Sequence, residues 1–537
     1  MHKFEPKQNN RLSQLAISLL IGLWAMAPGW ANALPVGGEI VSGAGSIEQS
    51  TQDMVIQQES QRLITNWQGF SIGSAESVQF IQPNSDAIAL NRVIGVDPSI
   101  ILGKLSANGQ VFLSNPSGVV FGAGAVVDVH GLLATTLNIS DADFLKDNYL
   151  FSQDPARQVA VVNNGVIFAD RYVGLAAPTV ENSGYIVVAD LGSVALASGT
   201  AMTLDFNGDG LINFAVTGAE GKLLSDSINN SGFIRANGGQ VLLTSKSAGD
   251  VIGNVINHSG IIEAQTVGKK DGKIILSSGD QGIVNVSGIL DAANTLITAG
   301  SDPKGSGTVI IPKGKSLMTN NGNIEIIADD LVLEGDLNSG TGDVSYTLVN
   351  GGPLVLSPDG SREGHLSGGD LSRITAQNLT LSTDDNIIVD GNTKENTNGI
   401  ADFVTLNSGR NINFGNADSA FPGLKLFAVN DINVNVGVTT TRTDFIAVAD
   451  SDSDDRGDFN VAPGVVVASA RDIDVNAVNI NANDASFNET RDLILNGTKV
   501  NAGTGGGTQP FADSILQGSL GTFLTEFFQN GGSDNGC

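Results

Sequence analysis

Short apolar strands separated by glycine and asparagine turns recur through most of this 537-residue chain, and this repetition constrains its fold more than any other feature. One unit begins with an Asn shortly before a Gly and continues with alternating apolar residues. Its glycines stand 19, 48, 28 and 28 residues apart, at Gly165, Gly184, Gly232, Gly260 and Gly288. A repeat of this size indicates stacked units, none of which can bury its apolar face alone.

A second unit consists of Asn or Asp, then Ile or Leu, any residue, and an apolar residue. Its six copies are spaced 63, 25, 20, 41 and 20 residues apart, and they begin at Asn323, Asn386, Asn411, Asp431, Asp472 and Asp492. These spacings are near multiples of 20 or 21, so they again predict stacked coils.

The units contain strands of two-residue period and polar turns, and helical patterns are missing almost throughout. This predicts an all-β protein, a β-solenoid running continuously from about residue 34 to 500, with Val, Ile and Leu inside and Gly and Asn at the corners. A β-sandwich or a propeller is the rival fold, but propeller blades need longer periods. About 20–25 residues per coil and ~4.8 Å between coils give a rod on the order of 100 Å long.

Residues 1–33 have the features of a signal peptide. Lys3, Lys7 and Arg11 form a basic start, residues 15–27 are apolar but too short to span a bilayer, and Ala31 and Ala33 supply the small residues of a cleavage site. A membrane anchor is the competing interpretation. We expect cleavage and export, and no transmembrane segment in the mature chain.

Charge and cysteine content narrow the class of partner. The chain has 28 Lys and Arg against 56 Asp and Glu, a net charge of −28, which argues against a nucleic acid or an anionic membrane as a partner. The single cysteine is the last residue, Cys537, so no disulfide forms within the chain. Stability must come from burial and backbone pairing.

A conspicuous turn lies in residues 110–122, QVFLSNPSGVVFG. Asn115 can bond back onto the chain, Pro116 presets φ at the second position, and Gly118 suits the fourth, which predicts a type I turn between two strands. We expect a surface turn, at which the change Asn115→Ala costs about 1 kcal/mol. The apolar strands on either side are expected to have unpaired edges that add to a partner's sheet.

From Leu34 to about Leu145 the chain resembles the secretion domain of the filamentous haemagglutinin family, the exoproteins of Gram-negative two-partner secretion. The resemblance rests on the order and spacing of LPVGGEIVSGAGSI, TNWQGFSIGSAESVQFIQPNSDAIALNRV, ILGKLSANGQVFLSNPSGVVFGAGAVVDVHGLLATT and ISDADFL. The family tetrapeptide Asn-Pro-Asn-Gly is here Asn115-Pro116-Ser117-Gly118. A second Asn-Pro motif carried by some members is missing.

The resemblance implies a right-handed parallel β-helix with an N-terminal cap. It also implies passage through the periplasm to the cell surface or medium of a Gram-negative bacterium, by way of an outer-membrane β-barrel transporter with periplasmic recognition domains. The expected division is a signal peptide in 1–33, the two-partner secretion domain with the first coils in 34–300, further coils in 301–500, and a Gly-rich linker and tail in 501–537. Residues Asn115, Pro116, Ser117 and Gly118 are the candidate secretion motif.

The tail carries a different pattern. Residues 511–528 (FADSILQGSLGTFLTEFF) have helical apolar spacing and predict a short helical tail that caps the last coil, as a solenoid requires. Retention at the cell surface, with Cys537 as a tether, is the functional alternative.

Two acidic segments could bind Ca²⁺, and one of them contains a possible integrin-type motif. Asp205, Asn207 and Asp209 match the start of a calcium loop, but alternating residues on both sides favour a hairpin. Asp450, Asp452 and Asp454 precede Arg456-Gly457-Asp458, a tripeptide that resembles the integrin-binding signal. The favoured interpretation there is a solvated loop, so no metal or other cofactor is assigned.

These features predict a secreted, non-enzymatic surface exoprotein, with adhesin as the leading function and an unknown host-cell or surface ligand. A haemolysin-like or ligand-scavenging exoprotein with the same secretion domain is the first alternative. A polysaccharide-acting β-helix enzyme is the second, but its nearest candidate, Asp384-Asp385, has no basic partner motif in the sequence, and no catalytic residue is assigned.

Overall fold

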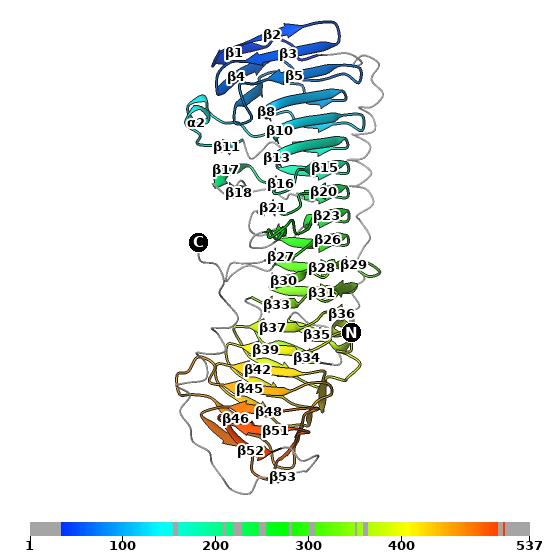
Figure 1. The fold of residues 1–537 in the computed structure, drawn as a ribbon, viewed down its shortest axis with the longest axis vertical. Coiled ribbons are helices and arrows are strands. Elements are labelled where there is room, and N and C mark those ends of the chain that lie inside the picture. Colours follow the sequence, from blue (N-terminus) through cyan, green and yellow to red (C-terminus); the bar gives the residue numbers. More distant parts are fainter. Residues whose placement is uncertain are drawn as a thin grey trace, which may run out of the picture.

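The computed structural model describes ten stretches of the chain. They are residues 34–153, 159–207, 211–218, 228–245, 254–278, 282–299, 307–349, 352–357, 364–502 and 509–510. Together they build one elongated rod of stacked coils, with the N-terminal strands at one end and β51 to β53 at the other (Figure 1).

A typical coil contains three short strands, and equivalent strands of successive coils pair in parallel. One coil holds β22 (Asn254–His258), β23 (Ile261–Ala264) and β24 (Lys273–Ser277), and the next holds β25 (Ile283–Val286), β26 (Ile289–Ala292) and β27 (Asn294–Ala299). β22 pairs with β25, β23 with β26, and β24 with β27. This stacking confirms that the fold is all-β and a parallel β-helix.

The strands divide among several sheets. Strands β8 (Lys104–Ser114), β10 (Val126–Thr135) and β13 (Val166–Ala177) are long and bend around a corner, so two faces of the rod merge into one 29-stranded sheet. Its other strands, beyond those named above and the terminal ones below, are β5 (Ser77–Ile81), β6 (Ile88–Val93), β15 (Tyr185–Val188), β16 (Ser193–Ser198), β20 (Phe233–Arg235), β21 (Gln240–Ser245), β29 (Ser316–Met318), β30 (Asn323–Ala328), β32 (Asp336–Asn338), β33 (Val344–Leu348), β36 (Ile374–Thr375), β37 (Leu379–Thr383), β39 (Val404–Ser408), β42 (Leu424–Ala428), β45 (Phe445–Ala449) and β48 (Ile473–Asn476).

The remaining faces form separate sheets. A nine-stranded sheet holds β22 and β25 together with β7 (Ser99–Ile101), β9 (Val119–Phe121), β12 (Ala160–Asn163), β14 (Thr179–Asn182), β19 (Ile228–Asn230), β28 (Thr308–Ile311) and β31 (Asp330–Leu333). Beyond it lie a seven-stranded sheet of β34 (Leu354–Ser357), β35 (His365–Ser367), β38 (Ile387–Val389), β40 (Ile412–Phe414), β43 (Ile432–Val434), β46 (Asp458–Val461) and β49 (Asn479–Asn481), and a five-stranded sheet of β41 (Ser419–Phe421), β44 (Val438–Thr440), β47 (Val466–Ala468), β50 (Ser486–Asn488) and β53 (Gln509–Pro510).

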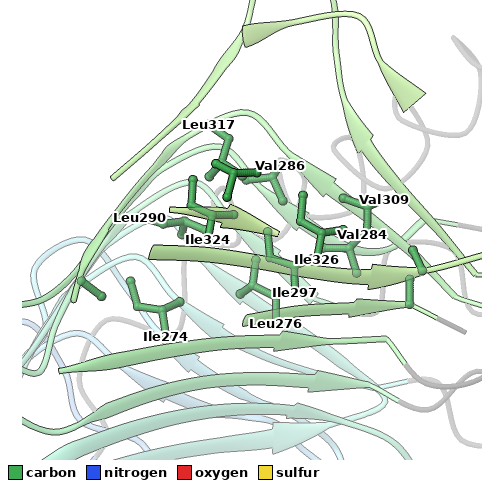
Figure 2. Close-up of a cluster of buried hydrophobic side chains, with 14 of the residues drawn as sticks. Ile274, Leu276, Val284, Val286, Leu290, Ile297, Val309, Leu317, Ile324 and Ile326 are labelled. Carbon is green, nitrogen blue, oxygen red and sulfur yellow. The ribbon is translucent and has the colours of Figure 1, made fainter. Parts of the chain in front are cut away.

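The core is a continuous aliphatic column along the axis of the rod. Strands such as β25 bury every second side chain, as the period of an extended chain requires. Figure 2 shows Ile274, Leu276, Val284, Val286 and Leu290 gathered in the interior from successive strands. All five are fully buried, so each coil depends on its neighbours to cover its apolar residues.

The first repeat of the sequence forms one column at a corner of the rod. A Cβ atom on Gly260 would lie 2.0 Å from the carbonyl oxygen of Gly232, and one on Gly232 would lie 2.3 Å from that of Gly184. Only glycine permits this approach. The spacing of 48 residues between Gly184 and Gly232 arises because a hairpin in residues 201–218 leaves the coil at that point.

The copies of the second repeat do not all stack in one column, although their nearly regular spacing suggested that they would. Asn386, Asn411 and Asp431 are stacked on one face, whereas Asp472 and Asp492 are stacked on another. In each case the side-chain oxygen accepts a hydrogen bond from the backbone N–H of the equivalent residue one coil later. Because more than one face has this requirement before a buried strand, the same motif recurs out of phase.

Antiparallel strands cover both ends of the rod. At the N-terminal end β1 (Glu39–Ser42) pairs with β4 (Arg62–Trp67), and β2 (Gly45–Gln49) with β3 (Asp53–Gln58), which confirms the expected cap. At the other end β52 (Thr498–Ala502) pairs antiparallel with β51 (Asp492–Leu495), and β53 with β50. The expected helical tail in 511–528 lies outside the described residues.

One part of the described chain leaves the coil path, contrary to the expectation of an uninterrupted helix from 34 to 500. It consists of α2 (Asp141–Leu145), β11 (Leu150–Ser152), β17 (Ala201–Asn207) and β18 (Leu211–Gly218), and the three strands form an antiparallel sheet outside the rod. Apart from α2, the described residues contain one further helix, the single turn α3 (Gly368–Leu371).

Candidate functional site

The candidate secretion motif is a tight turn between β8 and β9. The backbone N–H of Gly118 donates to the carbonyl oxygen of Asn115 over 3.0 Å, and the Asn115 side chain accepts a 2.8 Å hydrogen bond from the N–H of Ser117. Gly118 has φ of +113°, which favours glycine. The local turn chemistry expected from the sequence is therefore present.

Asn115 is not a surface residue, and here the sequence-based expectation was wrong. It is fully buried, and its Nδ2 donates to the carbonyl oxygen of Asp97 and to Oγ of Ser99, each at 3.0 Å. Its backbone N–H donates to the carbonyl oxygen of Thr135. The side chain thus ties the turn to the preceding coil, and its removal would leave buried polar groups unpaired.

The strands that flank the turn have no open edge in the folded rod. β8 pairs with β5 and β6 on one side and with β10 on the other. β9 lies between β7 and β12. Addition to a partner's sheet is therefore restricted to a state in which the later strands β10 and β12 have not yet joined.

A second apolar core lies between the outer surface of these strands and the segment outside the rod. Phe112 of β8 faces outward and contacts Phe144 of α2 and Tyr149, with ring centroids 6.1 and 5.6 Å apart. All three rings are buried. The sequence signal for this cover is the uninterrupted apolar run in β8, Val111–Leu113, because a strand covered on both faces loses its alternation.

Ion pairs fasten the segment to the rod. Arg62 of β4 contacts Asp147 at 2.7 Å, and Tyr149 Oη donates to the same carboxylate at 2.8 Å. Burial would raise the pKa of Asp147, but the hydrogen bonds from Arg62 and Tyr149 outweigh it and hold that pKa below its usual value. A hollow of about 320 Å³ is lined by these residues and by Asp86 and Arg171.

The first calcium candidate falls on the hairpin outside the rod. β17 and β18 pair in register from Met202 opposite Val216 to Asn207 opposite Leu211, so the backbone is the hairpin that the alternation predicted. The side chains of Asp205, Asn207 and Asp209 lie outside the described part of the structure, so calcium binding by these candidates is untested.

The second calcium candidate is a loop organised around Asp450. This residue is fully buried, and its carboxylate accepts hydrogen bonds from the backbone N–H groups of Asp454, at 2.8 Å, and Asp455, at 3.2 Å. Burial raises the pKa of Asp450 despite these bonds. Carboxylate oxygens of Asp450, Asp452 and Asp454 lie within 4.8 Å of one another, with the latter two exposed.

The Arg-Gly-Asp tripeptide lies at the start of a strand. Arg456 is 82% exposed, but Asp458 begins β46, where its carboxylate accepts a 2.8 Å hydrogen bond from Asn479 and its N–H donates to Asp431. The two charged side chains therefore do not share a free loop tip. A hollow of about 460 Å³ lies beside them, lined mostly by polar side chains.

The other candidate residues take part in ion pairs or hydrogen bonds within the rod. Asp385, which lacked a basic partner in the sequence, lies 3.6 Å from Arg410 in a partly exposed ion pair. His258 replaces an asparagine in a buried ladder, and His130 pairs with Asp170 at 3.2 Å. The cleavage residues Ala31 and Ala33 lie outside the described stretches. Within those stretches no helix is long and apolar enough to cross a membrane.

The N-terminal half of the chain is similar to known proteins. Residues 31–292 match the family of TPS secretion domains. Two heme/hemopexin-binding proteins of Haemophilus influenzae are 31% and 30% identical over 300 and 311 residues, which cover 54% and 53% of this chain and 32% of each relative. The chain thus matches about a third of the length of these relatives.

Two solved structures are similar to this chain. The HMW1 secretion domain from Haemophilus influenzae has a TM-score of 0.42 and 20% identity, with 86% of this chain and 100% of that chain covered. The filamentous hemagglutinin secretion domain has a TM-score of 0.33 and 12% identity, with 70% and 97% covered.

Proposed function

We propose that this chain, whose residues 31–292 are a TPS secretion domain of the two-partner secretion family, leaves the cell through a dedicated outer-membrane β-barrel transporter and acts outside it as a non-enzymatic adhesin. The match to the secretion domain is the observation that supports export through a transporter. The proposed action as an adhesin is a separate step and is tested separately.

The recognition motif for export is proposed to be the turn Asn115-Pro116-Ser117-Gly118. Pro116 restricts the unfolded chain, so the turn can form locally before the coils exist. In the folded rod Asn115 is buried and the flanking strands are paired on both edges, so the transporter must read the motif in the unfolded or partly folded chain. The mature chain contains no disulfide that would block this state.

Secretion of Asn115→Ala tests this step, provided that lost stability is controlled. Asn91 is the matched control, because it is also buried in the same domain, accepts a 3.0 Å hydrogen bond from Trp67 and donates to two backbone carbonyls. We expect Asn115→Ala to accumulate as processed protein in the periplasm while Asn91→Ala reaches the medium. Equal loss of both variants from the medium would refute recognition by the motif.

The adhesin assignment rests on the shape and surface of the rod. The two hollows described above are lined mainly by charged and polar side chains, whereas sites for small apolar ligands are mostly apolar. A long rod with an acidic sequence and shallow polar hollows suits a macromolecular ligand bound on the outside.

Binding of heme or hemopexin is the second candidate, and the names of the two Haemophilus influenzae relatives favour it. The purified mature chain separates the candidates when it is tested against host cells, heme and hemopexin in parallel. Saturable binding to cells, with no binding of heme or hemopexin, supports the adhesin. Saturable binding of heme or hemopexin alone would replace it with a ligand-scavenging exoprotein.

A further inference from the structure

Seven successive coils carry an apolar side chain at the same outward position of one face. We call this set the apolar column: Val126, Val166, Tyr185, Phe233, Ile261, Ile289 and Met318. Strand pairing places each member directly opposite the next, from β10 through β13, β15, β20, β23 and β26 to β29. These strands lie one above another along one side of the rod (Figure 1).

The members of the column are accessible. Tyr185 is 57% exposed, and Ile261, Ile289 and Met318 are between 36% and 39% exposed. Tyr185 and Phe233 contact each other, with ring centroids 5.9 Å apart. Seven coils at ~4.8 Å spacing give an apolar strip on the order of 29 Å long. A continuous apolar strip on an exposed face marks an interaction surface.

The charges beside the column change sign near its centre. Arg235 is two residues after Phe233 and Glu263 two residues after Ile261, so both project outward on the same side of the strip. The two residues are directly paired in adjacent strands. Along this side of the strip the paired residues are Phe168, Val187, Arg235, Glu263 and Asp291, so the positive group on one coil is followed by negative groups on the next two.

We propose that the apolar column is the interface of an antiparallel homodimer of this chain. The two-fold axis passes between Phe233 and Ile261, perpendicular to both rods. Under this symmetry Phe233 of each copy faces Ile261 of the other, and Tyr185 faces Ile289. The same operation places Arg235 of each copy opposite Glu263 of the other, twice per dimer.

A parallel pair of rods would not give this match. Its two-fold axis would run along the rods, so the side of the strip with Arg235 and Glu263 would face the opposite side of the other copy. That side is formed by the turns that contain Ser231 and Ser259, which carry no charge. Charge complementarity is thus specific to the antiparallel arrangement.

The dimer is expected to be weak. The strip is one to two residues wide, because Phe168 and Val187 lie beside Val166 and Tyr185, and this places the interface near the lower end of the size range for specific contacts. Each copy is also strongly acidic, with a net charge of −28 over the full sequence, and screening of this repulsion should tighten the dimer as salt is added. The proposal concerns self-association only, so it stands or falls independently of the ligand proposed above.

Sedimentation equilibrium of the full mature chain over a concentration series is the first test. We expect a monomer–dimer equilibrium that Tyr185→Asp and Ile261→Asp each weaken at least 10-fold. Val96→Asp is the matched control, because Val96 is 86% exposed but lies outside the column, and it should leave the equilibrium unchanged. A chain that stays monomeric up to about 100 µM, or an equal effect of Val96→Asp, overturns the proposal.

Charge reversal tests the geometry. Arg235→Glu and Glu263→Arg should each weaken the dimer, and the double variant should restore it. Since the two residues are also neighbours within one chain, the melting temperature of each variant is measured under monomeric conditions. Failure of the double variant to restore dimerisation, with its melting temperature intact, contradicts the antiparallel pairing.

Cross-linking gives an independent readout of orientation. Tyr185→Cys and Ile289→Cys are prepared as separate proteins in a Cys537→Ser background and treated with a short bifunctional thiol reagent. The antiparallel dimer predicts efficient cross-links only when the two proteins are mixed. Efficient cross-linking of Tyr185→Cys to itself would instead show a parallel dimer and refute the proposal.

Discussion

The side-chain amide of Asn230 donates a 3.1 Å hydrogen bond to Nδ1 of His258, one coil further along the rod. This contact ends a buried ladder in which Asn163 donates to Asn182 and Asn182 donates to Asn230, each at 2.8 Å. Because Nδ1 accepts, and Nε2 lies 3.3 Å from the carbonyl oxygen of Ile289, the imidazole is neutral with its proton on Nε2.

Acidification is therefore expected to destabilise the rod through His258. Burial lowers the pKa of His258 from 6.5 to about 4. The unfolded chain binds more protons between these values, so this contribution to stability is complete above pH 6.5 and is lost as the pH falls toward 4, by about 3 kcal/mol. Urea unfolding at a series of pH values measures it.

The control for this effect is His258→Asn, which restores the residue type of the ladder. Carboxylates also titrate in this range, so the informative quantity is the difference between the two proteins. The wild-type chain should lose stability relative to the variant between pH 6.5 and 4. A constant difference across that window would contradict the assignment.

The corner glycines should not tolerate a side chain. In Gly260→Ala the new Cβ would lie 2.0 Å from the backbone oxygen of Gly232, which no flexible group can relieve. We expect a loss of about 2–4 kcal/mol, seen as a lower urea midpoint. Gly415→Ala is the control, because its Cβ would meet only an Asp390 oxygen at 3.6 Å and should be nearly neutral.

At the turn, stability should depend on Asn115 and not on Ser117. Asn115→Ala leaves the carbonyl oxygen of Asp97, Oγ of Ser99 and the N–H of Ser117 without its side chain, and is expected to cost about 2–4 kcal/mol. Ser117→Asn keeps the backbone bond and should stay within about 0.5 kcal/mol of wild type. Chemical denaturation of the two purified variants measures both, and the reverse order would contradict the burial of Asn115.

The segment outside the rod should detach without unfolding the coils. Phe144→Ala removes the buried ring of α2 that contacts Phe112 and Tyr149, at a local cost of about 3–5 kcal/mol. Limited proteolysis should then cut in residues 136–153 while the circular dichroism of the rod is retained. Protection equal to wild type would show that the second core does not hold this segment.

Calcium should have little effect on the acidic loop. The carboxylate of Asp450 already accepts two backbone N–H groups, and Asp452 and Asp454 are exposed to water. We expect that about 1 mM Ca²⁺ leaves the melting temperature unchanged in wild type and in Asp452→Ala. A rise of several degrees that Asp452→Ala abolishes would establish a calcium site.

The stacking of the rod could be predicted because close contacts between coils restrict which residue types can occupy the equivalent position in each coil. Gly260 and Gly288 must be glycines for backbone reasons, and the buried residues between them must alternate. The sequence could not assign Asp431 and Asp472 to different faces, because both satisfy the same local need for an acceptor before a buried strand.

The structural features that could not be predicted depend on contacts with residues distant in the sequence. Burial of Asn115 requires Asp97 and Ser99 from the preceding coil, and nothing in the local tetrapeptide encodes them. The cover over Phe112 comes from residues 136–153, which carry no repeat. Two-sided burial of β8 was visible in its unbroken apolar run, but that run alone does not say what covers it.

The ladder that begins at Asn386 has a single direction along the chain. Its side-chain acceptors belong to the earlier coil and the N–H donors to the later one, at Asn411, Asp431 and Asp458 in turn. A finished coil is therefore a template for the residues that follow it. If the chain were exported amino end first, each coil folded outside the cell would hinder backward diffusion, and folding would then favour net movement outward.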